Sequence, residues 1–589
     1  MSFDGIALYG IVQEMQQLLG SRISRIYQPS QTELVFFILH NRKEYKLILS
    51  ADPVNCRIHL SDSVNDNPSS PPMFCMLLRK HLLGGKIKSI LQKGLERIVE
   101  MTITNTDEFM QLKEYKLVVE IMGKHSNIIL VDSQNTIIDS IKRIGFDVNR
   151  YREILPGKTY SAPPLEEKVN LMSIDDHYII SMIKEGVMSQ PEKPLSRWII
   201  DNFAGLSGTS AQEIALRAKV DHRLPICQLT EENVSQIARV FSNLRDALLN
   251  VSFQPHVYFS HDTKEPIDFW LFPMNLYDKI SSKPLDSINE AADLFYLKKA
   301  DYSAIKTLKH ELKSQVQKHI KKLNQNLAYL KQRLSKTSDS SKYKLWGELL
   351  YANLYQIPAG QKEVKLQNFY NANEEVVIPL NEKLSPSHNA QVYFKMYKKL
   401  QATEKNVEAR IKDTLMEIEY LESTLVNIEH SQNLQDLAEI QQELESQNYI
   451  RSSAPKRKTE SKTEGSTPLK FKSSDGVIIY VGKNNHQNDM LTFKKAKPED
   501  IWLHAKNTPG SHVIIEAQGN AVSDTTLTEA ATLAAYFSNG RNSSNVPVDY
   551  TLVRHVKKPT GAKPGFVIYY NQKTLYVTPD EKIVNKLSF

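Results

Sequence analysis

The chain has 589 residues, 41% of them apolar and 24% charged, which is typical of a soluble globular protein. Because one hydrophobic core cannot organise so long a chain, we expect about three to five domains. The three cysteines, Cys56, Cys75 and Cys227, form no CxxC pair. This argues against a disulfide framework and a cysteine-based zinc site, and it favours a reducing cytoplasm. No apolar run approaches the ~20 residues that a membrane-spanning helix needs, so no membrane partner is expected.

Positive charge is concentrated at the end of the chain. Residues 451–589 contain 20 Lys and Arg against 12 Asp and Glu, whereas the first 450 residues contain 54 against 55. A near-neutral body joined to a cationic end indicates a polyanionic partner at that end. The aromatic and amide-rich stretch 500–512 favours RNA. A basic domain with a solvated face explains the charge equally well, and charge alone does not separate the two.

The first 170 residues predict a mixed α/β domain. Apolar residues at helical spacing within residues 1–20 predict an amphipathic helix, and the lack of a basic start argues against a signal peptide. A second helix is expected over residues 71–81, where two prolines occupy the first turn and two glycines follow the end. Strands are expected at residues 21–27, 32–40, 44–50, 87–91, 97–104, 115–122 and 127–131.

Residues 171–285 show no strand pattern and predict a helical domain. Within it, residues 198–208 have the outline of two helices joined by a glycine-containing turn. A helix-hairpin-helix unit, whose turn amides can face a phosphate, has this outline. An ordinary αα-hairpin gives the same pattern and is the commoner explanation.

Residues 286–450 predict a coiled-coil arm. Apolar residues recur at spacings of 3 and 4 in two polar stretches, as in a coiled-coil seam. The first stretch would extend roughly 45 Å at 1.5 Å per residue. An insert at about 343–385 separates the two, which indicates an antiparallel pair, and the polar surface favours an arm that reaches toward a large partner. The seam residues are Ile305, Leu308, Leu312, Val316, Ile320, Leu323, Leu327, Leu330, Leu334, Val407, Ile411, Leu415, Ile418, Leu421, Leu425 and Ile428.

The end of the chain predicts a polar, basic linker at 451–468 and a compact α/β domain at 469–589. The predicted helix of this domain covers residues 525–538, and residues 482–488 are expected to form a turn rich in hydrogen-bond donors. Strands are expected at residues 477–481, 501–504, 511–516, 549–556, 565–570 and 574–578.

The chain contains none of the common motifs of self-contained catalysis: it has no HExxH, no GxSxG and no GxGxxG after a strand. The stretch Gly157-Lys158-Thr159 resembles the end of a phosphate-binding loop. However, Arg152 stands where that loop needs glycine, and Pro156 removes an amide donor. The histidines form no cluster with metal-ligand spacing. We therefore expect no catalytic residue, no metal site and no cofactor.

Several motifs together resemble the NFACT family, over the whole chain and in the family's domain order. In the N-terminal part they are Asp4-Gly5, Arg22–Pro29, Pro71–Lys80, Gly94–Arg97 and Glu120–Ile129. In the C-terminal part they are Asp500–His504, Pro509–His512, Glu529–Ser538, Asp549–Thr551, Val556–Pro559 and Lys563–Phe566. The resemblance implies an α+β multidomain fold. Its parts are a mixed α/β N-terminal domain with a glycosylase-like fold (1–170), a helix-hairpin-helix domain (171–285), a long antiparallel coiled coil with a small insert (286–450), and a C-terminal α/β RNA-binding domain (469–589).

The resemblance also implies a role in ribosome-associated quality control. Proteins of this family bind a large ribosomal subunit that still carries peptidyl-tRNA after a stall. They recruit tRNA, chiefly alanyl-tRNA in bacteria, and direct messenger-free alanine tailing of the nascent chain for degradation. The peptide-bond chemistry then belongs to ribosomal RNA, so a cytoplasmic factor that binds tRNA and rRNA is expected instead of an enzyme. A small RNA-binding helper protein and fibronectin stay open as further partners.

For the N-terminal domain, the resemblance assigns tRNA contact to five residues. The family's Asp-Arg pair at the tRNA anticodon arm aligns with Glu96 and Arg97, where Glu replaces the commoner Asp. A carboxylate accepts from a base amino group, and Arg forks onto phosphate or a base edge. Without the resemblance, an exposed turn ion pair of little energetic weight is the simpler interpretation. Glu120, Ile121 and Met122 match a second functional motif, although Ile and Met are also ordinary strand core.

For the C-terminal domain, the resemblance suggests RNA contact by four lysines and three rings. Lysines neutralise phosphates, and Trp or His can stack on bases. The lysines rank first, because a tryptophan on a strand is commonly a core residue. The residues are Trp502, His504, Lys506, His512, Lys557, Lys558 and Lys563.

Two functions of other classes compete with this one. A fibronectin-binding surface adhesin predicts an export signal or wall anchor, and the sequence shows neither. A nucleic-acid glycosylase or lyase predicts a nucleophile at the extreme N-terminus. The chain begins Met1-Ser2-Phe3 instead of the Pro-Glu start that those enzymes use, so base excision is not expected.

Overall fold

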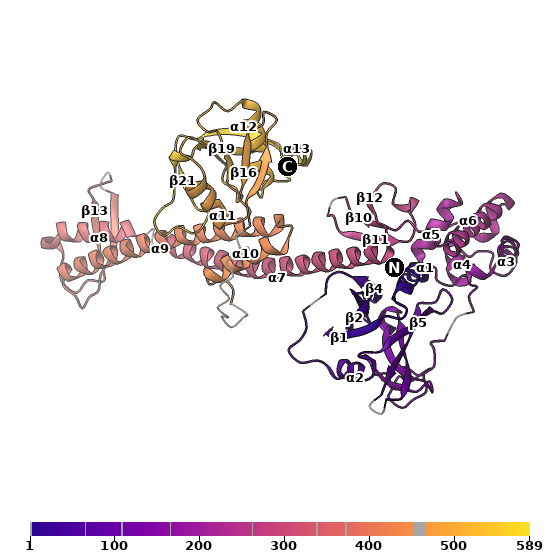
Figure 1. The fold of residues 1–589 in the computed structure, drawn as a ribbon. Coiled ribbons are helices and arrows are strands. Elements are labelled where there is room, and N and C mark those ends of the chain that lie inside the picture. Colours follow the sequence, from indigo (N-terminus) through magenta and orange to yellow (C-terminus); the bar gives the residue numbers. More distant parts are fainter. Residues whose placement is uncertain are drawn as a thin grey trace. The chain divides into compact units, whose positions relative to one another are not determined.

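The computed structural model describes residues 3–64, 66–107, 110–164, 167–261, 263–336, 340–371, 374–451 and 466–588. It divides into two compact units, Met1–Tyr302 and Ser303–Phe589, which Figure 1 shows in colours that follow the sequence. Both units mix helices and sheets, as expected for an α+β protein. The predicted linker at 451–468 lies mostly outside the described residues. None of the described helices combines the length and the apolar composition needed to cross a membrane.

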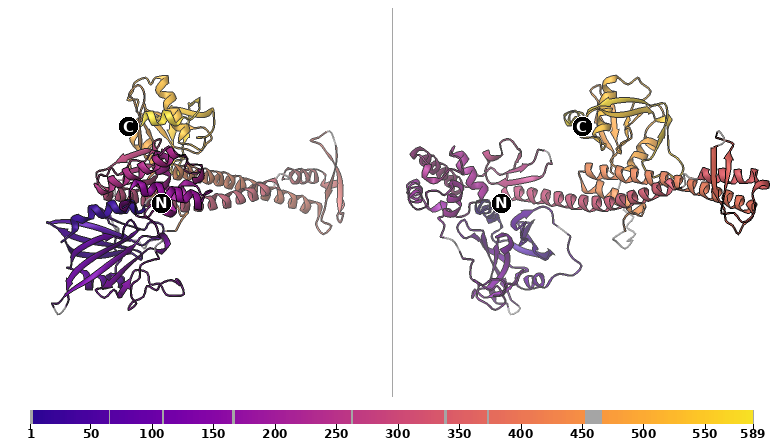
Figure 2. Two further views of the ribbon diagram at one scale, coloured as in Figure 1. Left: turned by 90° about the vertical axis from the view of Figure 1, so that its right-hand side faces the viewer. Right: turned by 180° about the vertical axis from the view of Figure 1, so that it is seen from behind.

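A nine-stranded antiparallel sheet dominates the first unit (Figure 2). Its order is β4-β3-β2-β1-β5-β6-β7-β8-β9, so only the β1–β5 junction joins strands that are not consecutive in sequence. β4 and β9 were not predicted. The strands are β1 (Arg22–Ser30), β2 (Glu33–His40), β3 (Lys43–Ser50), β4 (Arg57–Ser61), β5 (Lys86–Gln92), β6 (Ile98–Thr106), β7 (Leu112–Glu120), β8 (Asn127–Asp132) and β9 (Ile137–Ser140).

Helix α1 (Gly5–Met15) is more buried than the sequence predicted. None of its residues is exposed, so it is a core helix instead of an amphipathic surface helix. Asp4 caps it, because its carboxylate accepts a 2.9 Å bond from the Ala7 amide. Trp270 donates to the other carboxylate oxygen at 3.3 Å, and burial raises the pKa of Asp4 to about 6. The other helix against this sheet is α2 (Met73–Leu82).

Residues 171–285 contain helices, as predicted, but also a three-stranded sheet that the sequence analysis missed. Its order is β11-β10-β12, with β10 (His256–Phe259), β11 (Pro266–Trp270) and β12 (Ser281–Pro284). The strands are only four or five residues long, and two of them carry a terminal proline, so their alternation is too short to detect. The helices are α3 (Asp176–Ser189), α4 (Leu195–Asn202), α5 (Gly208–Arg217) and α6 (Glu231–Leu249).

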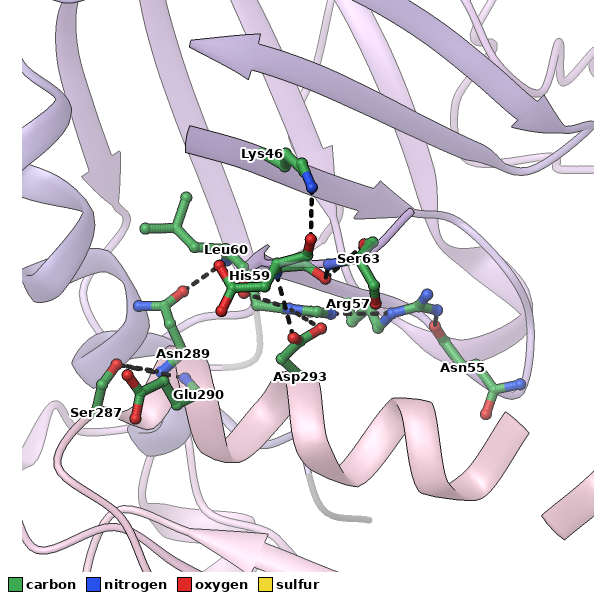
Figure 3. Close-up of polar contacts among 12 residues, drawn as sticks. Lys46, Asn55, Arg57, His59, Leu60, Ser63, Ser287, Asn289, Glu290 and Asp293 are labelled. Carbon is green, nitrogen blue, oxygen red and sulfur yellow. Dashed lines mark hydrogen bonds and ion pairs between the residues drawn. The ribbon is translucent and has the colours of Figure 1, made fainter. Parts of the chain in front are cut away.

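Helix α7 (Ile288–Ser335) begins on the first unit, where the Glu14 side chain from α1 and a backbone amide of β4 bond to its first turn. The Glu14 carboxylate accepts from the amides of Ile288 and Asn289 at 2.8 and 3.2 Å, which satisfies amides that a helix start leaves unpaired. Figure 3 shows Asn289 and Asp293 pointing toward β4, where Asn289 accepts from the Leu60 amide at 2.8 Å. Beside them, His59 is buried and its pKa falls to about 3, chiefly because of that burial.

The second unit contains the predicted antiparallel coiled coil, formed by α7 and α9 (Pro386–His430). Lys313 near the start of the seam in α7 pairs with Glu429 near the end of α9. The predicted seam is wrong at one position, because Leu415 is 46% exposed while Thr414 is buried. Thr414 lies 3 residues after Ile411 and 4 before Ile418, which continues the alternation of 4 and 3 along the seam, so the helical period and not hydrophobicity selects the buried residue there. The short helix α10 (Leu434–Ser446) packs on the pair.

The predicted insert forms a small core of its own around helix α8 (Ser340–Ala352) and the hairpin β13 (Glu363–Asn368) and β14 (Glu374–Pro379). The C-terminal domain has a six-stranded sheet covered by α12 (Asp524–Tyr536). The predicted turn at 482–488 is partly helical, because Asn484 caps α11 (Asn485–Met490). The remaining elements are β15 (Leu469–Lys472), β16 (Ile478–Val481), β17 (Ile501–Ala505), β18 (Val513–Ile515), β19 (Val546–Leu552), β20 (Val556–Lys557), β21 (Ile568–Tyr569), β22 (Lys573–Val577) and α13 (Glu581–Leu587).

Candidate nucleic-acid interface

The turn that carries Glu96 and Arg97 joins β5 to β6 and is fixed from below. Leu95 is 1% exposed and lies against Gly5 and Gly205, where an added Cβ would approach Leu95 atoms to 1.9 and 2.6 Å. The Glu96 amide donates to the Lys93 carbonyl at 3.0 Å. Glu96 and Arg97 are both half-buried. The two side chains therefore stand on a well-supported turn at the surface of the first unit.

The α4–α5 hairpin turn supports this site by packing. Gly205, at φ +79°, accepts a 2.9 Å bond from the Gly5 amide and lies against Leu95. Gly205 thus serves close packing, whereas Gly208 at the start of α5 has no atom within 4 Å of an added Cβ. An ordinary αα-hairpin fits the packing of Gly205, and phosphate contact by the turn amides stays a prediction.

The end of β7 lies directly beside this turn. The Ile121 amide donates to the Arg97 carbonyl at 2.9 Å, so the structure brings the two predicted N-terminal motifs together. However, Glu120 and Ile121 are completely buried, which excludes direct contact with RNA in this conformation. Met122 is half-buried, and its amide donates to the Ser126 hydroxyl at 2.8 Å. Of this motif, Met122 alone reaches the surface.

The buried Glu120 holds a residue that sequence reasoning missed. Arg152 donates through both terminal nitrogens to the two Glu120 oxygens, at 2.7 and 2.5 Å, and its own side chain is 8% exposed. Tyr160 donates to the same carboxylate at 3.0 Å. Burial, and then Glu120, raises the pKa of Tyr160. Burial lowers the pKa of Arg152, but Glu120 outweighs it and the net direction is upward. This forked geometry is the strong form of an ion pair.

In the C-terminal domain, the predicted ring contacts are largely internal. Trp502 is 0% exposed and His512 is 1% exposed, so neither presents a face for base stacking. His512 bonds the Thr492 hydroxyl at 2.8 Å and the Gly565 carbonyl at 3.1 Å. His504 is half-buried and stacks on Trp502 at 5.8 Å between centroids. Burial lowers the pKa of both histidines, that of His512 to about 3.

The four predicted lysines differ in how they are engaged. Lys506 pairs with the buried Asp549 at 3.4 Å, and Lys558 forms an ion pair with Asp489. Lys563 donates to Gln447 at 2.9 Å and lies over the Tyr449 ring at 5.1 Å. Lys557 is exposed, and within the described residues it has no ion-pair partner. Lys557 is therefore the lysine with its charge most available to phosphate.

Lys563 belongs to a polar contact between the C-terminal domain and the helices α9 and α10. Asn485 donates to the Thr424 hydroxyl and to Glu443, both at 3.1 Å. Lys483 pairs with Asp436 at 3.1 Å. Burial raises the pKa of Glu443. Residues at the start of this domain thus serve docking within the second unit.

Comparison with known proteins gives the same family for both the N-terminal and the C-terminal parts of the chain. The model for the NFACT N-terminal and middle domains matches residues 4–463, and the NFACT RNA-binding domain matches residues 468–571. The Rqc2 homolog RqcH of Bacillus subtilis (strain 168) is 38% identical over 590 residues, covering 100% of each chain. The ribosome quality control complex subunit NEMF of Homo sapiens is 24% identical over 376 residues, 60% of this chain and 33% of that one.

Several similar solved structures carry a different name, that of fibronectin- or fibrinogen-binding proteins. The C-terminal part of the fibronectin/fibrinogen-binding protein from Streptococcus suis is 35% identical and covers 49% of this chain and 100% of that one. Its TM-score is 0.39, which supports no conclusion about function. The family models, in contrast, cover nearly all of the sequence in order. The chain belongs to the NFACT family.

Proposed function

We propose that this protein acts in ribosome quality control. In this role it binds a stalled large ribosomal subunit carrying peptidyl-tRNA, recruits alanyl-tRNA and directs messenger-free alanine tailing of the nascent chain. The ribosome supplies the peptide-bond chemistry. The full-length likeness to an RqcH protein supports the general role. The observation that carries the tRNA assignment is the supported turn in which Arg97 and Glu96 stand side by side at the surface.

The proposal divides the predicted residues by accessibility. Glu96 and Arg97, with Met122 beside them, contact tRNA, while Glu120 and Ile121 position them from inside. In the C-terminal domain Lys557 contacts phosphate. Lys506 and Lys558 also contact phosphate, and to do so they give up their ion pairs with Asp549 and Asp489. Trp502, His504 and His512 hold the shape of that surface.

The test separates tRNA binding from subunit binding. Arg97→Ala is expected to leave co-sedimentation with large subunits largely unchanged and to lower the amount of tRNA that co-purifies. The matched control is Arg239→Ala, which removes an exposed arginine from α6. Equal loss of both activities in Arg97→Ala would contradict the division of labour. Binding of neither RNA by the unmodified protein at low salt would contradict the whole proposal.

A helper protein remains a proposed partner of this activity. The fibronectin alternative has no feature of this chain in its favour beyond the names of structural neighbours. It is tested by the same preparation, since an adhesin would bind immobilised fibronectin and ignore large subunits.

A further inference from the structure

The segment from Ile144 to Ile154 forms a closed loop at the edge of the first unit. Its ends are bridged by two backbone bonds between Ile144 and Ile154, at 3.0 and 2.8 Å. Inside it, the amides of Val148 and Asn149 both donate to the Gly145 carbonyl at 3.1 Å, and the Tyr151 amide donates to the Asn149 side chain at 2.9 Å. The loop is therefore organised by its own hydrogen bonds.

The tip of this loop exposes three large apolar side chains within six residues. Phe146 is 62% exposed, Val148 is 74% exposed and Tyr151 is 89% exposed. Single exposed apolar residues need no explanation, but a group of them on an ordered loop marks an interaction site. Arg150, between two of them, is exposed and has no ion-pair partner within the described residues. The tip thus offers two rings and one guanidinium to a partner.

The loop is joined to the candidate tRNA site through the buried ion pair. Arg152 lies one residue after Tyr151 and donates hydrogen bonds to Glu120 through both terminal nitrogens. The residue after Glu120 is bonded to the Arg97 carbonyl at 2.9 Å. A continuous chain of short contacts therefore fixes the loop relative to the Glu96–Arg97 turn. A loop that is already ordered before binding loses less entropy when it binds. Ordering this loop is therefore a role for the buried Glu120.

The chemistry of the tip favours unpaired nucleic-acid bases over a protein partner. Segment 141–158 contains five Lys and Arg against two Asp and Glu, and a basic surface suits a polyanion. Aromatic rings and arginine planes stack on splayed bases of single-stranded RNA loops. A stable protein interface instead needs about 800 Å² on each side, which a tip of six residues does not provide.

We infer that Tyr151, Phe146 and Arg150 form a second contact for tRNA, in which unpaired loop bases stack on the rings. This inference rests on the proposed function, because the occupant is the tRNA that the Glu96–Arg97 turn recruits. Glu120 and Arg152 are positioning residues for it: they hold the loop without touching RNA.

The test measures binding of the full-length protein to two fluorescent RNAs, a tRNA anticodon stem-loop and a blunt duplex of the same stem. Tyr151→Ala is expected to weaken stem-loop binding roughly five- to a hundredfold, as loss of one stacked base does, and to leave duplex binding unchanged. Tyr151→Phe keeps the ring and should restore binding. Tyr178→Ala, which removes a tyrosine that is 48% exposed on α3, is the matched control.

The outcomes separate this inference from the function on which it rests. If the unmodified protein binds neither RNA, the proposed function fails and the inference fails with it. If the unmodified protein binds the stem-loop and Tyr151→Ala binds it equally well, only the inference is overturned. If Tyr151→Ala keeps full RNA binding but loses large-subunit co-sedimentation, the tip is a ribosome contact of another kind and the inference is overturned as well.

Discussion

The two regions predicted to contact RNA differ in how many of their family-motif residues lie at the surface. In the N-terminal unit, a buried ion pair between Glu120 and Arg152 supports a surface that still presents Glu96, Arg97 and Met122. In the C-terminal domain, most predicted residues are engaged within the protein, and Lys557 alone stays both exposed and without an ion-pair partner among the described residues. The difference shows that residues of a family motif can be buried groups that position a site as well as exposed groups that contact the ligand.

The largest effect that could break this comparison is expected at Trp502. Replacing it with Ala removes a fully buried ring and should lower the free energy of unfolding of the C-terminal domain by about 3–5 kcal/mol. Thermal unfolding measures this. Trp502→Phe is the control, because it keeps an aromatic ring and removes an indole N–H that has no partner among the described residues. A stable Trp502→Ala protein with reduced RNA affinity would show that the ring contacts RNA directly.

A somewhat smaller effect is expected at Glu120. Glu120→Gln leaves the buried Arg152 without its carboxylate, which should cost about 3 kcal/mol in urea-induced unfolding. Glu114→Gln breaks the exposed pair with Lys88 and should cost less than about 1 kcal/mol. The double variant Glu120→Gln with Arg152→Met should recover part of the loss. No loss in Glu120→Gln would contradict a supporting role for this pair.

The buried His512 is expected to make the stability of the second unit fall in acid. Its pKa is lowered by burial to about 3, against about 6.5 in an unfolded chain. Between these values the unfolded state binds a proton that the folded state lacks, so stability is complete above pH ~6.5 and falls toward pH ~3. One such group gives a slope of at most about 1.4 kcal/mol per pH unit.

Urea unfolding at several pH values would measure this slope. His512→Asn should flatten it, whereas His388→Asn, at an exposed position in α9, should leave it unchanged. His430, whose pKa burial lowers to about 4, is present in both the unmodified protein and His512→Asn, so its contribution cancels. The pKa of His504 is also lowered by burial, and its ring lies 5.6 Å from that of His512, so the difference in slope belongs to this pair of histidines. An unchanged slope in His512→Asn would mean that this ring is not buried in the neutral form.

The smallest expected effect is on the salt dependence of RNA binding, and it tests which lysine contacts phosphate. Lys557→Gln should lower the slope of log affinity for RNA against log salt by about one, as loss of one phosphate contact does. Lys563→Gln should leave that slope unchanged, because Lys563 is engaged with Gln447 and Tyr449. Binding measured from low to moderate KCl distinguishes them. The reverse result would place the phosphate contact at Lys563.

Local patterns predicted the fold better than they predicted the roles of residues. The strands from β1 to β8 other than β4, both long helices and the insert follow from alternation and heptad spacing. Thr414 could not be identified as a seam residue, because a polar side chain carries no hydrophobic signal. The β10–β12 sheet was missed because its strands are too short for alternation to be seen.

The ion pair beneath the N-terminal site could not be predicted, because its two residues are far apart in the sequence. Glu120 and Arg152 are 32 residues apart, and only the register of β7 beside the following loop brings them together. The sequence indicated only that Arg152 stands where a phosphate-binding loop would need a glycine, and it predicted no partner for this residue. The turn at Glu96 and Arg97 was found through the family motif, and its accessibility then depended on Leu95, Gly5 and Gly205, which no periodicity connects.

The contacts at the first turns of α7 also set an order of events during synthesis. Glu14 accepts a hydrogen bond from the amide of Asn289, which is synthesised 275 residues later. Asp4 accepts one from Trp270, which is synthesised 266 residues later. At about 5–20 residues per second, translation takes roughly 15–55 s to supply these partners. Until then the Glu14 carboxylate lacks the amides that donate to it, and the Asp4 carboxylate lacks its indole donor. The nascent N-terminal unit therefore lacks these contacts until about half of the polypeptide has been made.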